Sequence, residues 1–92
     1  LSLRMGRFMP DGTILSGSGF SVIKGAFPAG VYTISFSTAF VIAPIVVFSP
    51  TNPFVFPALI TSLPSAFGIE CHAANGTAAD TGIMFIALGL RA

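Results

Sequence analysis

Few side chains in this sequence could carry acid–base chemistry. The 92 residues include three carboxylates and one histidine, which are Asp11, Glu70, Asp80 and His72. A catalytic carboxylate pair would need two of these acids to converge, and nothing in their spacing requires it. Asp11 belongs to a turn pattern, Glu70 is expected on the outer face of a strand, and Asp80 precedes the last predicted strand.

Nucleophilic and metal chemistry lack the partners that they need. Cys71 is the only cysteine, so the chain can form neither an internal disulfide nor a cysteine-based metal cluster, and we expect Cys71 to be a small buried residue. One histidine cannot build a metal site within a chain; three copies of His72 around a threefold axis could, but an exposed histidine at a strand end is the commoner case. Residues 16–20, SGSGF, are neither a hydrolase elbow nor a phosphate loop. We predict no catalytic residues, no metal and no cofactor, and therefore no enzyme.

The composition predicts that copies of the chain cover one another. Hydrophobic residues make up 53% of the sequence and charged residues only 8%, against roughly 25% charged in average soluble domains. A chain this short forms one domain, residues 1–92, and hides only about 60–65% of its unfolded surface. Large apolar patches usually mark an interface. Because residue 1 is Leu rather than Met, we also expect a fragment of a longer protein.

The charge pattern argues against nucleic acid and anionic lipid as partners. The net charge is +1, and the four basic residues, Arg4, Arg7, Lys24 and Arg91, are scattered along the chain. Such scattering provides no phosphate-neutralising stripe and no polybasic segment.

The uncharged stretch 31–50, VYTISFSTAFVIAPIVVFSP, has the length of a membrane helix but not its pattern. Residues 31–36 alternate with period two, and β-branched and aromatic residues dominate. Prolines at 44, 50, 53, 57 and 64 leave no room for a long helix. We expect no membrane insertion, but two strands separated by a turn at 41–44.

The rest of the chain shows the same pattern of short strands separated by turns. We predict strands at residues 3–9, 20–24, 31–37, 45–49, 54–61, 66–72 and 82–91, with Ile14 and Leu15 continuing the first strand beyond a turn at 10–13. Residues 16–19 are predicted as a flexible break and 27–30 as a turn. Pro57 indicates an edge strand or a bulge. The predicted fold is all-β, an antiparallel β-sandwich, jelly-roll-like, of seven or eight short strands.

The last predicted strand is apolar on both faces. Ile83, Phe85 and Ala87 alternate with a second set, which consists of Met84, Ile86, Leu88 and Leu90. A strand covered on one side only would carry polar residues on the other. Either this strand is central to a two-sided core, or its second face meets a partner subunit, which we favour in so small a domain. We predict the second set as the interface of a closed homo-oligomer.

The connections carry the side chains best suited to recognition, because binding residues often lie on loops held by a rigid sheet. The candidates for ligand binding are Thr51, Asn52, Phe54, His72, Asn75, Thr77 and Asp80. Small polar groups with an aromatic could hydrogen-bond to a sugar and stack on it; ordinary polar turns are the alternative. Asn75-Gly76-Thr77 matches both a glycosylation acceptor and a tight turn, of which we favour the turn, and both predict exposure.

Three sequence motifs, in this order along the chain, resemble those of a known family. They are GSGFSV at 17–22, GVYTISF at 30–36 followed by Phe40 and APIVV at 43–47, and GIMFIALG at 82–89. Over residues 5–91 this order resembles the small all-β C-terminal head domains of phage tail fibres and of bacterial or viral collagen-like fibrous proteins. The H-type lectin domain has a similar but less close Phe-x-x-x-Pro-x-Val cadence.

The resemblance implies a homotrimer at the end of a stalk, on the extracellular or virion surface. It further implies a non-catalytic trimerisation and receptor-recognition head, with a cell-surface glycan or receptor as a possible partner. The alternative function is a lectin-like carbohydrate-binding domain that uses the loops between strands.

Overall fold

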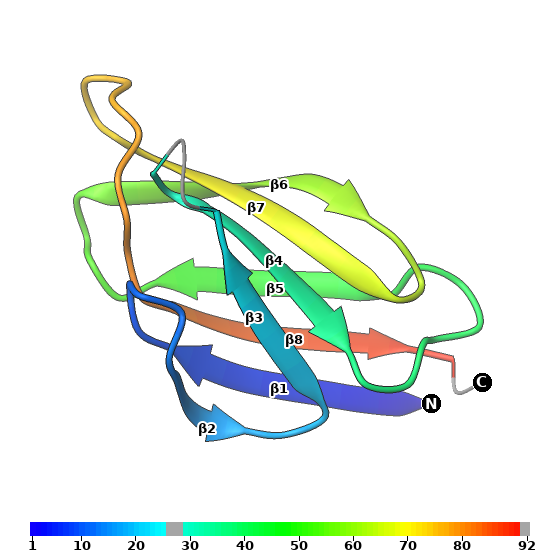
Figure 1. Cartoon of the computed structure of the whole chain (residues 1–92). Coiled ribbons are helices and arrows are strands. Elements are labelled where there is room, and N and C mark those ends of the chain that lie inside the picture. Colours follow the sequence, from blue (N-terminus) through cyan, green and yellow to red (C-terminus); the bar gives the residue numbers. More distant parts are fainter. Residues whose placement is uncertain (26–28, 91–92) are drawn as a thin grey trace.

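Two four-stranded antiparallel sheets pack face to face in the computed structural model, which describes residues 1–25 and 29–90 (Figure 1). The described residues form β1 (Ser2–Phe8), β2 (Ile14–Gly17), β3 (Phe20–Lys24), β4 (Val31–Phe36), β5 (Ile45–Pro50), β6 (Val55–Ser62), β7 (Ala66–Ala73) and β8 (Ile83–Gly89). Sheet A has the strand order β2-β1-β8-β5, and sheet B has the order β3-β4-β7-β6. The predicted all-β sandwich is confirmed.

Alternation of side chains assigns each central strand one face toward the core. In β8, Ile83, Phe85 and Ala87 are buried while the intervening residues are exposed. In β7, Phe67, Ile69 and Cys71 are all fully buried, as their alternation predicts. The uncharged stretch 31–50 forms two strands, β4 and β5, as predicted, and they lie in different sheets. Among the described residues, no helix is long and apolar enough to cross a membrane.

Aromatic rings in edge-on and tilted contact join the two sheets. Phe20 of β3 lies edge-on to Phe85 of β8, with ring centroids 4.9 Å apart. Phe85 contacts Phe67 of β7 at 5.2 Å, and Phe67 continues to Phe36 of β4 at 5.8 Å. Aromatic pairs in such tilted arrangements contribute about 0.5–1.5 kcal/mol each beyond their burial. This row of rings fixes the distance between the sheets.

Two features of the edge strands bear on the sequence predictions. β6 is an edge strand, which confirms the edge reading of Pro57. The register of β6 shifts between Leu59 and Thr61, whereas Pro57 pairs regularly with Cys71, so the bulge does not lie at the proline. The flexible break at 16–19 is wrong in its first half. Ser16 and Gly17 belong to β2, which pairs with β1, and Gly17 has a φ of 94° directly against the Met5 carbonyl, where a Cβ would not fit.

The prediction that Ile14 and Leu15 continue the first strand is wrong, because the turn at 9–13 reverses the chain and both residues belong to β2, antiparallel to β1. The remaining boundaries differ from the predictions by one or two residues at most in the described part of the chain. The turn predicted at 27–30 and the end of the last strand at Arg91 fall partly outside the described residues. Loop 37–44, which includes the predicted turn at 41–44, connects β4 of sheet B to β5 of sheet A.

Gly30 and Gly76 provide a matched test of close backbone packing. Both have positive φ, 80° and 88°. A Cβ on Gly30 would lie 2.5 Å from the Cys71 carbonyl oxygen and 2.7 Å from that of Ala79, whereas one on Gly76 would meet nothing within 4 Å. We expect Gly30→Ala to lower the free energy of unfolding by at least about 3 kcal/mol and Gly76→Ala by about 1 kcal/mol. Denaturant unfolding at one fixed chain concentration measures both, and equal losses would contradict the packing at Gly30.

Candidate functional site

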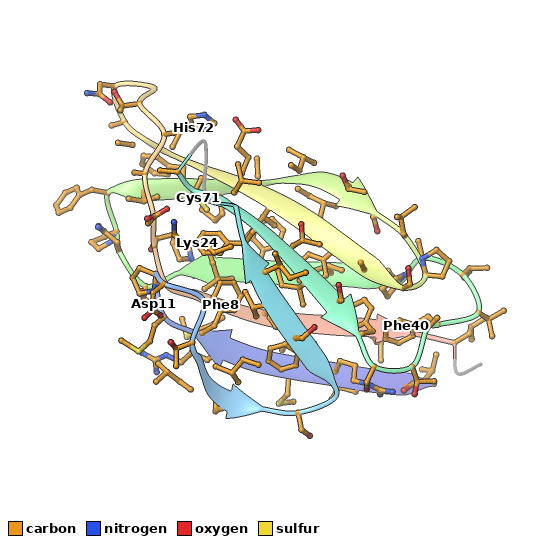
Figure 2. All side chains as sticks on the ribbon, in the orientation of Figure 1. Phe8, Asp11, Lys24, Phe40, Cys71 and His72 are labelled. Atoms are coloured by element: carbon orange, nitrogen blue, oxygen red, sulfur yellow. The ribbon has the colours of Figure 1, made fainter. Side chains whose placement is uncertain are left out.

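The loops that carry the predicted recognition residues gather at one end of the sandwich. Figure 1 shows turn 9–13, loop 51–54 and loop 74–82 at the end opposite to Leu1. We call these three segments the distal loops. Figure 2 shows Asp11, Lys24 and His72 toward the same end, and Phe40 toward the other. The sheets therefore bring together residues that are far apart in the sequence.

Asp80 holds two strand connections together at this end. One carboxylate oxygen accepts a hydrogen bond from the Gly30 backbone N–H at 2.6 Å. The other oxygen lies 3.2 Å from the Lys24 ammonium group, and both side chains are partly exposed. Charge-assisted bonds of this kind are the stronger ones. Asp80 was predicted as a ligand-binding residue, and in the structure its two oxygens make contacts within the protein.

Thr81 fixes the position of loop 51–54. Its buried hydroxyl accepts a hydrogen bond from the Asn52 backbone N–H at 3.3 Å and donates one to the Gly82 carbonyl at 3.1 Å. The Thr51 backbone N–H donates to the same Gly82 carbonyl at 2.9 Å. Loops 51–54 and 74–82 are thus held against one another through the backbone.

Two buried titratable groups lie behind the distal loops. The Tyr32 hydroxyl donates to the Pro10 carbonyl, which attaches turn 9–13 to the core. Burial, followed by the nearby Asp80 charge, raises the pKa of Tyr32 to about 12. Burial likewise raises the pKa of the Cys71 thiol to about 11, with Asp80 adding to it. Cys71 is consequently a protonated thiol at neutral pH, and its predicted role as a small buried residue fits this environment.

The predicted ligand-binding residues differ in their exposure and in whether their side chains already form hydrogen bonds within the protein. The side-chain oxygens of Asn52 and Asn75 accept the backbone N–H groups of Phe54 and Thr77, at 2.9 and 3.0 Å. These are local turns, and the predicted turn at Asn75 is confirmed. Thr51 and Thr77 are exposed, and Phe54 is 76% exposed. The distal loops therefore present an aromatic ring and two hydroxyls on a hydrogen-bonded backbone.

His72 belongs to a different surface, the outer face of sheet B. Its Nε2 lies 3.0 Å from Oε1 of Glu70, and Phe56 of β6 stands directly opposite it. Neither Glu70 nor Phe56 was among the predicted site residues. The alternation of β7 places Glu70 beside His72 and was readable from sequence, but the partner strand and its register were not.

The predicted oligomer interface lies on the outer face of sheet A. Three rows cross strands β1, β8 and β5, with each row made of directly paired residues. The rows are Leu3–Leu88–Ile45, Met5–Ile86–Val47 and Arg7–Met84–Ser49. We call these nine positions the apolar face, because seven of the nine side chains are large and hydrophobic and all seven are exposed in the single chain.

Sequence reasoning found only the β8 part of the apolar face. Met84, Ile86 and Leu88 form its central column, and Leu90 follows the strand and is also exposed. The flanking columns, Leu3 and Met5 in β1 and Ile45 and Val47 in β5, were missed. Shallow hollows lie on both sides of the central column, between β8 and each neighbouring strand. Arg7 and Ser49 give the face a polar rim at one end.

The outer face of sheet B is different in character. Its exposed or partly exposed positions include Ser21, Thr33, Ser35, Glu70 and His72. The sandwich thus has one apolar outer face and one mixed polar outer face. A mixed polar face is typical of contact with water, whereas a large apolar patch is typical of an interaction site.

Comparison with protein-family models and with curated proteins finds no match. Among residues 1–25 and 29–90, no three histidine, cysteine, aspartate or glutamate side chains lie together in a way that could hold a metal ion.

The raised pKa of Tyr32 predicts the alkaline limit of stability. The folded state holds the phenolic proton more tightly than the unfolded state, whose tyrosine has a pKa near 10. This contribution to stability is complete below pH 10 and is lost as the pH rises toward about 12. Tyr32 is the only tyrosine and tryptophan is absent, so tyrosinate absorbance reports it directly. We expect a midpoint near 12 in the native protein and near 10 in denaturant, and a native midpoint near 10 would show an unburied phenol.

Proposed function

We propose that this chain is a non-catalytic head domain that assembles with copies of itself, as a homotrimer, at the end of a fibrous protein. In this proposal the apolar face is the assembly surface and the distal loops are free for receptor recognition at an extracellular or virion surface. Leu1 lies at the opposite end from the distal loops (Figure 1), so a stalk joined there would leave the loops clear. β1 pairs with β8 in sheet A, and β4 pairs with β7 in sheet B. Pairing of strands that are distant in the sequence supports the jelly-roll-like description.

The apolar face is the single observation that carries the proposal. The accessible surface of the chain is 5062 Å², close to the roughly 5,050 Å² expected for a folded monomer of this mass. The chain is therefore folded as tightly as others of its size, and the unusual feature is which side chains remain outside. A row-by-row array of Leu, Ile, Met and Val on three adjacent strands is what the core of an interface looks like.

The size of the apolar face supports a ring rather than a two-fold dimer. Three strands about 4.8 Å apart and five residues at about 3.4 Å each define a flat footprint of roughly 250 Å². A stable interface buries about 800 Å² per partner, so further apolar surface must contribute. The edge strand β6 and the turn after it expose Leu59, Ile60 and Leu63. Two different apolar surfaces on one subunit suit a heterologous contact that closes into a ring.

The energy of such an assembly would rival that of the fold. Covering about 800 Å² per subunit at about 25 cal/mol/Å² gives a gross term of about 20 kcal/mol. Lost translational freedom and side-chain ordering offset about 4–15 kcal/mol of it. We infer that assembly and folding are coupled.

The alternative function is a lectin-like carbohydrate-binding domain that uses the inter-strand loops. The exposed Phe54 and the hydrogen-bonded backbone of loop 51–54 favour it, because an aromatic side chain offers a large contact area with few torsions to order when a ligand binds. The two functions are compatible, since the loops lie at one end and the apolar face along one side.

Ile86 and Ile23 test the assembly as a matched pair. Ile86 is the central residue of the apolar face and is 47% exposed; Ile23, on the outer face of sheet B, is 62% exposed. Sedimentation equilibrium should give the wild-type protein three times the 9.5 kDa chain mass. We expect Ile86→Asp to abolish that species, because it would bury an unpaired carboxylate, and Ile23→Asp to retain it.

Three results would count against the proposed assembly. They are a wild-type mass equal to that of one chain, an Ile86→Asp protein of unchanged mass, or loss of assembly in both variants. The last would show that the contact also involves the outer face of sheet B around Ile23, which the proposal leaves free.

A further inference from the structure

A patch that combines an exposed aromatic ring with a glutamate–histidine pair lies on the outer face of sheet B. Phe56 pairs with His72, and Ala58 pairs with Glu70, across strands β6 and β7. Residues two apart on a strand share a face, and directly paired residues have Cβ atoms about 4.5–5.5 Å apart. We call these four residues the β6–β7 patch.

The β6–β7 patch leaves both its ring and its polar atoms accessible. Phe56 is 56% exposed. Oε1 of Glu70 and Nε2 of His72 lie 3.0 Å apart, and both side chains are partly exposed. The remaining carboxylate oxygen of Glu70 and Nδ1 of His72 form no hydrogen bond with another side chain or backbone group of the described residues. Ala58 is small and exposed, so the space above Glu70 beside the ring is open.

We propose that the β6–β7 patch binds a carbohydrate, with one pyranose ring stacked on Phe56 and its hydroxyls bonded to Glu70 and His72. This proposal rests on the recognition role proposed above and places the site on a strand face rather than in the loops. A pyranose has a face of polarised C–H groups, which an aromatic π-face attracts, and a rim of hydroxyls that both donate and accept. Phe56 matches the first feature, and the Glu70–His72 pair matches the second.

Two other kinds of ligand fit the β6–β7 patch less well. An apolar protein segment that covered Phe56 would also desolvate the Glu70–His72 pair, which is costly without replacement hydrogen bonds. A metal ion would need at least one further ligand, and none lies near these two among the described residues. A sugar satisfies the polar atoms while it covers the ring.

The site also has a consistent place in the proposed assembly. The β6–β7 patch belongs to sheet B, and the apolar face belongs to sheet A on the other side of the sandwich. The proposed ring contact uses the end of β6 and the turn after it, at Leu59, Ile60 and Leu63, whereas Phe56 lies at the start of β6. Copies that meet in this way leave the β6–β7 patch toward solvent. Each subunit would then present one sugar site outward, and several weak sites on one assembly would bind a multivalent glycan surface by avidity.

Binding of the assembled wild-type protein to an array of neutral oligosaccharides tests the proposal. The methyl glycoside of the sugar common to the bound members then serves as the probe for titration calorimetry. We expect Phe56→Ala to weaken binding at least tenfold by removing the stacking surface. Glu70→Gln and His72→Gln should each weaken it severalfold to tenfold while leaving the circular dichroism spectrum unchanged. Ile23→Ala, which removes an equally exposed apolar side chain from the same sheet face, should bind as the wild type does.

The proposal is overturned if the wild-type protein binds no member of the array. It is equally overturned if both Phe56→Ala and Glu70→Gln keep wild-type affinity, which would move any sugar site to the distal loops. The sedimentation mass of each variant separates this test from that of the assembly. Glycan binding by a monomer would refute the assembly alone, and an assembled protein without glycan binding would refute the site alone.

Discussion

The constraint on which this structure depends is that strand β8 has no polar face. Its inner residues, led by Phe85, complete the row of aromatic rings that joins the two sheets. Its outer residues, with Ile86 at the centre, pair on both sides with apolar residues of β1 and β5. A single chain can bury only one of these two faces. The hydrophobic effect acts equally on the other, and at roughly 25 cal/mol per Å² it is large enough to drive association.

Hydrogen bonds, rather than apolar packing, organise the distal loops. These hydrogen bonds join segments that are far apart in sequence. Asp80 bonds to Gly30, Thr81 bonds to Asn52, and Tyr32 bonds to Pro10. A recognition surface built in this way is organised before it meets a ligand, so binding costs less entropy. The sandwich therefore separates an apolar assembly surface from polar surfaces suited to recognition.

Local patterns were enough to predict most of the fold. The alternation in β7 placed Cys71 inward, and Pro57 predicted the edge position of β6. Pairings between distant strands were not predictable, because register is decided by contacts that a single sequence does not display. Hence the flanking columns of the apolar face, such as Met5 beside Ile86, were missed. For the same reason the position of Phe56 opposite His72 was missed. The hydrogen bond between Asp80 and Gly30, which are fifty residues apart, was also missed.

The three methionines allow the central claim, that copies of the chain cover the apolar face, to be measured in solution. In the single chain Met5 and Met84 are 50% and 40% exposed on the apolar face, and Met9, in the turn beyond it, is 41% exposed. Mild peroxide oxidation converts accessible methionines to sulfoxides, and peptide mass spectrometry gives the rate for each. If copies cover the face, Met9 reacts at least several times faster than Met5 and Met84. Similar rates at all three, in protein at working concentration, would mean that the face stands open to water and that the account is wrong.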